Sequence, residues 1–369
     1  MPSQKQISAH PSSAKELRRT GRGAAENPPN RFEKIHLEPD ADWNPEDDDG
    51  GRPQGPRTQF YQDHSQTVIA RNDSPDIGFE TSLNPYRGCE HGCSYCYARP
   101  THEFLGFSAG LDFESKIMVK ADAPELLRAE LRSPKWQPQV IFLSGVTDCY
   151  QPVERKLKLT RRCLEVLAEF RNPVFIITKN RLVTRDMDLL SELARHQAVA
   201  VWLSITTLDG ELRRVMEPRT APPSARLAAI RELAQAGIPA GVNVAPVIPG
   251  LTDHELPAIL QAAADAGATA AGYAVVRLPY AVAPLFEQWL GTHFPDRKEK
   301  VLNRLRALYG GKLYNAQWGK RLSGEGIFAE QLERMFEVAR RKAGIRHYGH
   351  ELSASSFRRP LGAQLPLFS

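Results

Sequence analysis

Three of the five cysteines, Cys89, Cys93 and Cys96, lie within eight residues of one another. An odd number of cysteines with this spacing does not predict a disulfide framework, and it indicates metal or redox chemistry instead. Three thiolates on one tight loop can bind three irons of a four-iron, four-sulfur cube, and Gly88 and Gly92 allow the backbone to wrap around it. The fourth iron then has no protein ligand, and an open metal position is typical of a catalytic site.

Two other interpretations of the cysteine cluster stay open at this point. A zinc site would take His91 or His102 as its fourth ligand, although zinc sites usually have paired C-x2-C spacing and the sequence has no second pair. A simple electron-transfer cluster would need a fourth cysteine, and neither Cys149 nor Cys163 has an obvious spacing for that role. The open cube is therefore the favoured interpretation.

The elements that position this cluster begin at about residue 80, where short β-rich runs alternate with amphipathic helical runs. The β-rich runs are apolar throughout rather than alternating, as expected when both faces of a sheet are covered. The expected strands are residues 81–86, 140–144, 174–178, 198–206, 240–247 and 270–277, and the expected helices are 123–132, 157–170, 185–195, 224–236, 253–266 and 282–290.

This alternation predicts an α/β fold, a partial (β/α)6 barrel of parallel strands with right-handed crossovers over residues 61–295. Gly237 and Gly267 stand where helix C-terminal caps belong, each just before the next strand. In barrels of this kind the chemistry lies at the C-terminal ends of the strands, and the cysteine cluster directly follows the first strand.

The two ends of the chain differ from the barrel in composition. Residues 1–60 hold eight of the 28 prolines and an acidic run beside two glycines, which predicts a disordered segment. Residues 297–359 hold 15 Lys and Arg against six Asp and Glu, so they carry a net charge of +9 in a chain whose total is +5. We expect a basic helical extension over residues 296–352 and a flexible tail over 353–369. This charge suits a solvated helical face or a surface that binds nucleic-acid phosphates.

Composition and apolar run length also bear on where the protein works. The chain is 41% hydrophobic and 25% charged, which is ordinary for a soluble globular protein. No apolar run approaches the roughly 18 residues of a membrane span, and no signal segment opens the chain. We therefore expect a cytoplasmic protein without a membrane partner.

The residues around the cysteines resemble a known family. The pattern C-x3-C-x-aromatic-C after the first strand of a partial barrel is the signature of the radical S-adenosylmethionine (radical SAM) superfamily. Residues 84–89 (Asn-Pro-Tyr-Arg-Gly-Cys), 97–99 (Tyr-Ala-Arg) and 147–152 (Thr-Asp-Cys-Tyr-Gln-Pro) are similar to its spore photoproduct lyase-like, or DNA repair photolyase-like, subgroup. The resemblance covers roughly residues 58–350.

The resemblance implies two cofactors, a 4Fe-4S cluster held by Cys89, Cys93 and Cys96, and S-adenosylmethionine bound to the open iron. One electron, supplied through the cluster by a donor such as flavodoxin or ferredoxin, breaks the bond between sulfur and the 5′ carbon. The radical so formed abstracts a hydrogen atom from the substrate, while the protein supplies placement and excludes side reactions.

The family pattern also points to residues near the cysteines that would hold S-adenosylmethionine. Tyr95, the aromatic residue inside the cysteine motif, is expected to lie against the adenine, or else to pack within its loop. Thr147 and Asp148 end the second strand, where many relatives carry a Gly-Gly-Glu run that contacts the methionine amino group. This sequence departs from that run, and both residues are expected to take its place.

Four further polar residues lie at the ends of later strands and complete the expected cofactor-binding set. Lys179 follows the third strand and Arg219 lies beyond the fourth, so either cation could pair with the methionine carboxylate. Ser204 lies on the fourth strand, within reach of the ribose or carboxylate, and Asn243 lies on the fifth. Each of these residues could equally serve in a loop or in a layer of the barrel.

The two remaining cysteines are expected to differ in role. Spore photoproduct lyases use a cysteine after the second barrel strand as a hydrogen-atom donor, and Cys149 occupies a similar place in the topology. A thiol suits this role because its S–H bond is weak, although a free cysteine also packs well as a small buried hydrophobe. Cys163 lies on a helix and is expected to belong to the core.

The last residues carry a separate signal. Residues 364–368, from Gln364 to Phe368, read Gln-Leu-Pro-Leu-Phe and resemble the short peptide with which bacterial replication and repair proteins bind the sliding clamp. An extended peptide of this kind offers hydrogen bonds from Gln and two apolar anchors to a preformed surface. The alternative is an apolar terminus that packs against its own domain.

Together these features predict a radical SAM enzyme, lyase-like and acting in DNA lesion repair. A first alternative is the same chemistry on a protein or a small molecule, with the basic region merely solvated. A second is a non-catalytic iron–sulfur protein that associates with DNA.

Overall fold

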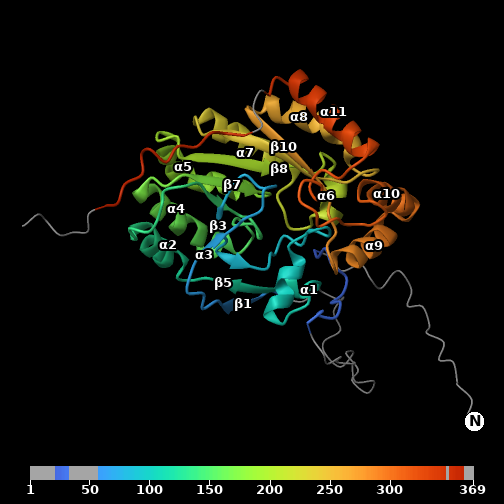
Figure 1. The fold of residues 1–369 in the computed structure, drawn as a ribbon, viewed down its shortest axis with the longest axis horizontal. Coiled ribbons are helices and arrows are strands. Elements are labelled where there is room, and N and C mark those ends of the chain that lie inside the picture. The colour runs from blue at the N-terminus through green and yellow to red at the C-terminus, as the bar shows by residue number, and fades with distance from the viewer. Residues whose placement is uncertain (1–20, 33–56, 346–348, 361–369) are drawn as a thin grey trace, which may run out of the picture.

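The computed structural model describes residues 21–32, 57–345 and 349–360, and Figure 1 shows one curved sheet with helices along its outer side. Six neighbouring strands run parallel in the order β10-β9-β8-β7-β6-β3, which confirms the expected parallel sheet, and a short strand, β2, pairs antiparallel with β3. The strands are β2 (Ile69–Arg71), β3 (Thr81–Leu83), β6 (Ile141–Leu143), β7 (Val174–Thr178), β8 (Val199–Ser204), β9 (Ala240–Val247) and β10 (Ala270–Val275).

The longer helices between the strands bury apolar side chains on one face, as the sequence predicts. On α4 (Leu159–Phe170), for example, Leu164 and Leu167 are fully buried. Gly237 and Gly267 have φ values of 72° and 98°, the left-handed conformation that ends a helix and that glycine adopts without strain. The other helices here are α2 (Ala123–Arg132), α3 (Glu154–Leu157), α5 (Met187–Ala194), α6 (Gly210–Met216), α7 (Pro223–Gln235) and α8 (Leu256–Asp265), with 3-10 helices at Arg181–Asp186 and Asp253–Glu255.

A second, three-stranded sheet lies beside the first and was not expected. The run predicted as one strand over residues 81–86 divides at Pro85, which has no N–H to donate to a sheet. The chain continues as β4 (Tyr86–Arg87), which pairs antiparallel with β5 (Lys116–Val119), while β1 (Gln59–Gln62) pairs parallel with β5. A 3-10 helix (Arg99–Leu105) and α1 (Leu111–Ser115) connect β4 to β5.

Residues 21–32 are packed against the barrel, which differs from the disorder expected for residues 1–60. The N–H groups of Gly23 and Ala24 donate to the Glu114 carboxylate at 3.0 and 2.8 Å. A Cβ atom on Gly23 would lie only 1.7 Å from the carbonyl oxygen of Gly92, so this segment lies directly on the loop that carries the cysteines. Residues 1–20 and 33–56, the rest of that prediction, lie outside the described residues.

The basic C-terminal extension is helical, as expected, and it also closes the open side of the barrel. Residues 310–325, which lie between α10 and α11, form what we call the crossing segment. Val275 of β10 donates to the carbonyl of Leu322 at 2.8 Å, and Gly319 donates to the Asp76 carboxylate, beyond β2, at 2.6 Å. No described helix combines the length and hydrophobicity needed to cross a membrane. The helices are α9 (Val282–His293), α10 (Pro295–Leu308) and α11 (Ile327–Lys342).

Residues 349–360 form an arm that runs past the N-terminal ends of the strands. The N–H of Ser353 donates to Gln197 at 2.9 Å, just before β8, and the N–H of Arg358 donates to Phe170 at 2.9 Å, at the end of α4. The predicted flexible tail over 353–369 therefore differs from the structure as far as residue 360, and residues 361–369 lie outside the described part.

Candidate active site

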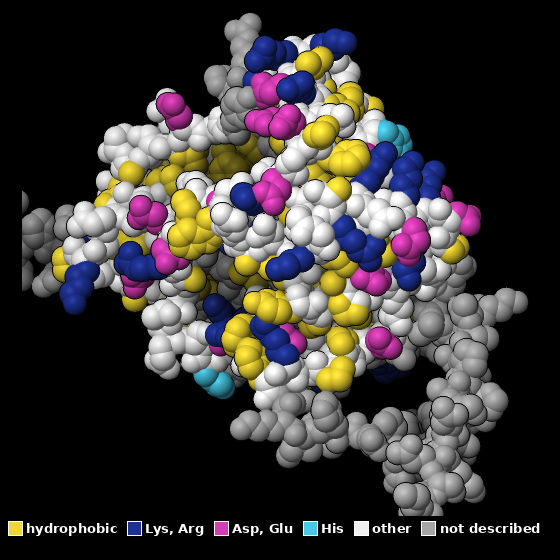
Figure 2. Space-filling model, turned by 45° about the vertical axis from the view of Figure 1, so that its right-hand side comes forward, with side chains coloured by type: hydrophobic (Ala, Val, Ile, Leu, Met, Phe, Trp, Pro, Cys, Tyr) yellow, Lys and Arg dark blue, Asp and Glu magenta, His cyan; other side chains and the backbone are white. Residues whose placement is uncertain are grey.

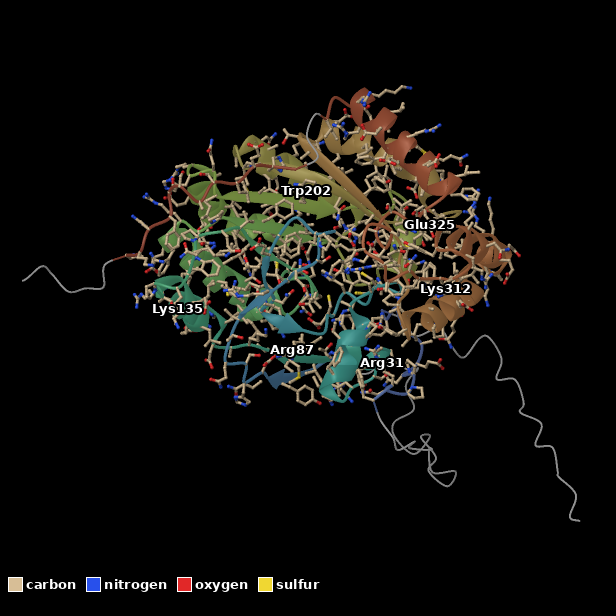
Figure 3. All side chains as sticks on the ribbon, in the orientation of Figure 1. Arg31, Arg87, Lys135, Trp202, Lys312 and Glu325 are labelled. Atoms are coloured by element: carbon tan, nitrogen blue, oxygen red, sulfur yellow. The ribbon has the colours of Figure 1, made fainter. Side chains whose placement is uncertain are left out.

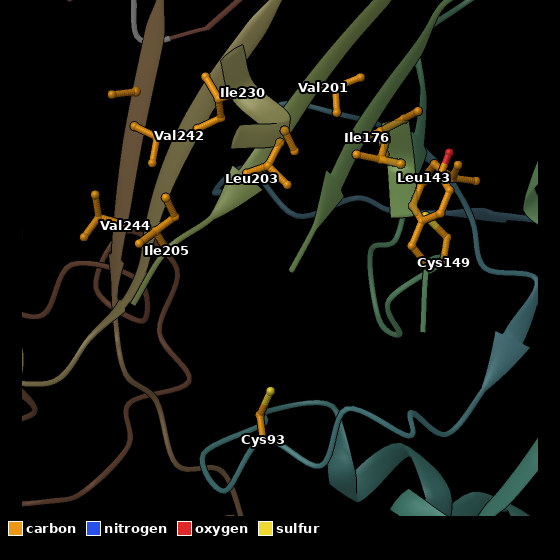
Figure 4. Packing of buried hydrophobic residues seen from close by; sticks show 14 of the residues in the cluster. Cys93, Leu143, Cys149, Ile176, Val201, Leu203, Ile205, Ile230, Val242 and Val244 are labelled. Atoms are coloured by element: carbon orange, nitrogen blue, oxygen red, sulfur yellow. The ribbon is translucent and has the colours of Figure 1, made fainter. Parts of the chain in front are cut away.

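The three cysteines lie on the connection between β4 and the following 3-10 helix, which we call the cysteine loop (residues 88–97). Cys89 and Cys93 are buried, and Cys96 is partly exposed. The N–H of Cys89 donates to the carbonyl of Phe113 at 2.9 Å, which fixes the start of the loop on α1. Figure 4 shows the Cys93 side chain pointing from the loop toward the ends of the strands. The thiols thus face the end of the sheet where barrel chemistry concentrates.

The surroundings of the thiols fit a bound iron–sulfur cluster. Burial raises the pKa of all three thiols, and the negative charge of Glu217 adds to the rise at Cys93. Lys179 acts in the opposite direction on Cys93 and Cys96, so a cation already lies near the place where thiolates need compensation. The Ser94 hydroxyl is buried with no hydrogen-bond partner among the described residues. That hydroxyl can donate to a group held inside the loop.

Of the two histidines that a zinc site would need, His91 is engaged at both ring nitrogens and His102 at one, since the buried Nδ1 of His102 has no hydrogen-bond partner among the described residues. His91 Nδ1 lies 3.3 Å from the Asp148 carboxylate, and its Nε2 lies 3.4 Å from the Asn180 amide. His102 Nε2 lies 2.9 Å from the carbonyl oxygen of Lys116. Within the described ranges, no three Cys, His, Asp or Glu side chains surround a point where one metal ion could bind. A cube does not require such convergence, because each thiolate binds a separate iron.

Backbone hydrogen bonds hold the cysteine loop from two sides. The N–H of Ser94 donates to the carbonyl of Met216 at 3.0 Å, which joins the loop to the end of α6. The N–H of Glu90 donates to the Gln151 side chain at 2.9 Å, which joins it to the connection after β6. The loop is therefore positioned by the strand ends that it faces.

A fully buried ion pair, which was not predicted, lies beneath the loop. Arg99 Nη2 is 2.5 Å from the Glu114 carboxylate, and both side chains are 0% exposed. Arg99 also donates to the carbonyl of Cys93 at 2.8 Å, while Glu114 accepts the N–H groups of Gly23 and Ala24. This pair therefore ties a cysteine-bearing backbone to the N-terminal segment.

Three of the predicted cofactor-binding residues lie in one row across the strand ends. Ser204 of β8 is in register with Asn243 of β9. Thr178 is in register with Leu203, so Lys179, the residue after Thr178, continues the row beside Ser204. The structure thus brings together Lys179, Ser204 and Asn243, and their contact with S-adenosylmethionine stays a prediction.

Glu217, which was not predicted, connects this row to the cysteine loop. Its buried carboxylate accepts hydrogen bonds from Tyr95 and Arg226 and, at 2.8 Å, from Thr206, and it lies 3.6 Å from Lys179 Nζ. Burial opposes ionisation of Glu217, but Arg226 and Lys179 hold its pKa well below the usual range. A carboxylate at this place therefore fixes the Tyr95 hydroxyl and balances two cations.

Thr147 and Asp148 are both engaged with protein partners. The Asp148 carboxylate accepts the Thr178 hydroxyl at 2.7 Å and the N–H of Lys179 at 2.8 Å. The Thr147 hydroxyl donates to the carbonyl of Tyr86 at 3.0 Å. Asp148 therefore links the ends of two strands beside the cysteine loop, and the contacts predicted for both residues with the cofactor stay predictions.

Arg219 does not join the row of Lys179. Its guanidinium lies 3.2 Å from the Glu90 carboxylate and 3.4 Å from the Thr58 hydroxyl, and its N–H donates to the carbonyl of His91 at 3.3 Å. Arg219 instead packs against the segment of the cysteine loop between the first two cysteines.

Cys149 follows β6 as expected, but its side chain packs in the core. It is 0% exposed, and its N–H donates to the Ser144 hydroxyl at 2.6 Å. Figure 4 shows it beside Leu143 at the end of β6, apart from Cys93 on the cysteine loop. Its role as a hydrogen-atom donor stays a prediction, whereas Cys163 is fully buried on α4, as expected.

Tyr97, for which no role was predicted, marks an accessible side of the cysteine loop. Its hydroxyl donates to the carbonyl of Gly145, after β6, at 2.8 Å, and the residue is 43% exposed. The Arg277 guanidinium lies over its ring, 3.9 Å from the ring centroid. An aromatic ring held at both ends and covered by a cation is a fixed surface beside Cys96.

Comparisons with known proteins agree with this architecture. The model of the radical SAM superfamily matches residues 83–263. The uncharacterized protein Rv2578c of Mycobacterium tuberculosis (strain H37Rv) is 39% identical over 235 residues, which are 63% of this chain and 68% of that protein. The radical SAM Nalpha-GlyT isomerase of Pseudomonas phage M6 is 24% identical over 253 residues, which are 68% of this chain and 50% of that protein.

Among solved structures, the chain is similar to spore photoproduct lyase. The complex of that enzyme with a dinucleoside spore photoproduct has a TM-score of 0.58 and 17% sequence identity, over 80% of this chain and 82% of the other. A variant of it with bound AdoMet has a TM-score of 0.56 and 18% identity over the same shares. These similarities show a common fold over most of both chains.

Proposed function

This chain belongs to the radical SAM superfamily, and from that premise we propose that it acts on nucleic acid, as a lyase-like enzyme of DNA lesion repair. Its cofactors are a 4Fe-4S cluster and S-adenosylmethionine. When both are bound, they supply a radical that abstracts a hydrogen atom from the substrate. The residues of the chain must then hold cofactor and substrate and keep water out.

The proposal gives each group of site residues one task. Cys89, Cys93 and Cys96 hold the cluster as thiolates. Lys179 offers its ammonium group, in the row that it shares with the fourth and fifth strands, to the carboxylate of S-adenosylmethionine. Tyr95 supports the adenine with its ring, because the hydrogen bond from its hydroxyl to the Glu217 carboxylate prevents the ring from turning away.

The observation that carries the nucleic-acid part is the mixture of cations and exposed aromatic rings between α10 and α11. Trp318 is 54% exposed and Phe328 is 41% exposed, and the Arg304 guanidinium lies 5.8 Å from the Phe328 ring centroid. Lys312, near the start of the crossing segment, is exposed as well (Figure 3). Lys and Arg side chains are frequent over this part of the surface (Figure 2). Aromatic faces stack with bases and cations neutralise phosphates, so this surface suits a single-stranded or extruded nucleotide.

The fold supports the same proposal, because spore photoproduct lyase has been solved with a dinucleoside lesion bound. The test is to reduce the loaded enzyme anaerobically and to measure 5′-deoxyadenosine with undamaged and with ultraviolet-irradiated DNA. We expect formation of 5′-deoxyadenosine that increases with irradiated DNA. Formation that no nucleic acid stimulates would favour a protein or small molecule as substrate, and none at all would favour a non-catalytic binding protein.

Cys149 is the hydrogen-atom donor in this proposal. Its support is its position on the connection after β6, next in sequence to Asp148, which contacts His91 of the cysteine loop. Because the thiol is buried in the core, the proposal requires the connection after β6 to move when substrate binds. The Cys149→Ala variant, described in the Discussion, tests that requirement.

A sliding clamp is the partner that we propose for the C-terminal peptide, Gln364 to Phe368, which lies outside the described residues. The arm before it is fixed to the barrel through Ser353 and Arg358. A tethered peptide raises the local concentration of the enzyme at DNA. Deletion of residues 364–369 should abolish co-elution with the clamp, and retained binding would refute this part.

A further inference from the structure

The radical chemistry of the proposed function needs one electron from outside, because the described residues contain one cluster of cysteines and two isolated, fully buried thiols. The place where this electron enters can be sought on the outer sides of the cysteine loop. One of these sides is covered, since Gly23 lies directly on Gly92 there. The side that faces the strand ends belongs to S-adenosylmethionine and substrate. Two parts of the loop remain, the exposed part at Cys96 and Tyr97 and the buried segment between Cys89 and Cys93, and we consider the second because a basic surface adjoins it.

An open hollow of about 680 Å³ adjoins that segment. Asn180, in its wall, lies 3.4 Å from His91 of the cysteine loop. Arg219, also in its wall, contacts the loop twice: its backbone N–H donates to the carbonyl of His91, and its guanidinium pairs with the Glu90 carboxylate. The hollow and the cysteine loop therefore share a wall. We call it the arginine hollow, because its lining includes Arg155, Arg181, Arg185 and Arg219.

The rim of the arginine hollow is strongly positive. Three exposed cations lie close together here, Arg155 and Lys156 on α3 and Lys158 just after it. None of the three forms an ion pair with a described residue. Glu154 and Asp186, the acids paired with Arg185, are 0% exposed and lie beneath it, whereas Glu232, the partner of Arg181, is 33% exposed. An approaching molecule therefore meets more cations than carboxylates at this surface.

An apolar side chain stands among these cations. Leu157 is 42% exposed between Lys156 and Lys158. Protein interfaces of modest size combine an apolar anchor with a charged rim, whereas a phosphate backbone offers nothing for an exposed leucine to bind. This combination favours an acidic protein over a nucleic acid at this surface.

We propose that the arginine hollow and its rim, Arg155 to Lys158, are the docking site of a small acidic one-electron carrier protein with a flavin or an iron–sulfur centre. One electron leaves the reduced centre of the carrier and passes to the cluster, and no bond forms or breaks and no proton moves in that step. The association is of the weak, electrostatically steered kind that electron-transfer partners use. This inference rests on the radical chemistry of the proposed function but not on its nucleic-acid substrate.

The test compares two charge-reversal variants of the full-length holoenzyme. The first is Arg155→Glu/Lys156→Glu at the rim. The second, matched in charge, is Arg334→Glu/Lys342→Glu on α11, where both side chains are exposed and far from α3 (Figure 1). Stopped-flow absorbance follows oxidation of reduced flavodoxin and reduction of the cluster at low ionic strength, with dithionite as a small reductant for comparison. Titration with oxidised flavodoxin measures binding directly, without any turnover.

We expect the rim variant to be reduced by flavodoxin about tenfold more slowly, or worse, and to bind it correspondingly more weakly. Its reduction by dithionite and its affinity for DNA should match the wild type, and added salt should diminish the difference. The α11 variant should be reduced by flavodoxin at the wild-type rate.

Three results would overturn the proposal. They are an unchanged flavodoxin rate in the rim variant, an equal slowing in the α11 variant, and a loss of DNA affinity at the rim with flavodoxin reduction intact. If the dithionite rate also falls, the milder pair Arg155→Gln/Lys156→Gln decides, because it removes charge without reversing it. Absence of a flavodoxin-specific slowing in that pair overturns the proposal as well. All of these outcomes can be interpreted even if DNA does not stimulate the formation of 5′-deoxyadenosine.

Discussion

Replacement of Glu114 by Gln tests the buried ion pair that supports the cysteine loop. The carboxylate is 0% exposed and lies 2.5 Å from the guanidinium of Arg99, which is equally buried. Removing one partner of a buried pair leaves an uncompensated charge, which typically costs about 3–5 kcal/mol. The glutamine keeps one carbonyl oxygen, which can accept from Gly23, Ala24 or Arg99, so we expect the free energy of unfolding to fall by about 3 kcal/mol, the lower end of that range.

Urea unfolding of the anaerobic protein, followed by circular dichroism, measures this change. Glu333→Gln on α11 is the matched control, because Glu333 is exposed and the same substitution there should change stability by at most about 0.5 kcal/mol. A second readout is local. Since Glu114 anchors Gly23 and Ala24, trypsin should cleave after Arg22 faster in the variant than in the control.

The double variant Arg99→Met/Glu114→Leu removes both charges and leaves apolar groups of similar size. It also leaves the N–H groups of Gly23 and Ala24 and the carbonyl groups that Arg99 binds without their partners. Because a buried polar group left unsatisfied costs about 1–3 kcal/mol, the double variant should be at least as unstable as Glu114→Gln. A loss below about 1 kcal/mol in Glu114→Gln, or a double variant clearly more stable than the single one, would refute the reasoning.

Three other predictions concern the site and the closure of the barrel. Lys179→Ala should weaken binding of S-adenosylmethionine by about tenfold in equilibrium titration, because a charge-assisted hydrogen bond is worth about 1.5–3 kcal/mol, and an unchanged Kd would contradict its role. Cys149→Ala should still form 5′-deoxyadenosine, but the ratio of repaired product to 5′-deoxyadenosine should fall at least about tenfold. If that ratio is unchanged, the thiol serves only in packing. Asp76→Ala removes the acceptor of Gly319 and Arg321, so amide hydrogen exchange in the crossing segment should speed up, whereas Asp73→Ala, at an exposed position, should leave it unchanged.

The barrel could be predicted from the sequence because its signals are local and periodic. The apolar strand runs, the amphipathic helices and the caps at Gly237 and Gly267 each depend on neighbouring residues only, and the structure places them as expected. The cysteine spacing is equally local, and so is the position of Lys179 directly after a strand. These features need no knowledge of distant parts of the chain.

The features that the sequence did not predict depend on distant partners. Residues 21–32 look polar and irregular in isolation, and they are ordered because Glu114, some ninety residues later, accepts two of their N–H groups. Glu217 lies two residues from Arg219, which was singled out instead, and only the fold shows which of the two faces the Lys179 row. In the same way, the arm is fixed by carbonyl groups such as that of Gln197, which no pattern in residues 349–360 reveals.

The central claim, that this radical SAM protein abstracts hydrogen from nucleic acid, is tested most directly by isotope transfer. Oligonucleotides that contain ultraviolet lesions and carry deuterium on their deoxyribose and base carbons would be incubated anaerobically with reduced enzyme and S-adenosylmethionine, and 5′-deoxyadenosine would be analysed by mass spectrometry. We predict deuterium in 5′-deoxyadenosine from the lesion-containing strand and none from the undamaged strand. Undeuterated 5′-deoxyadenosine from every labelled strand, with turnover otherwise intact, would contradict the claim.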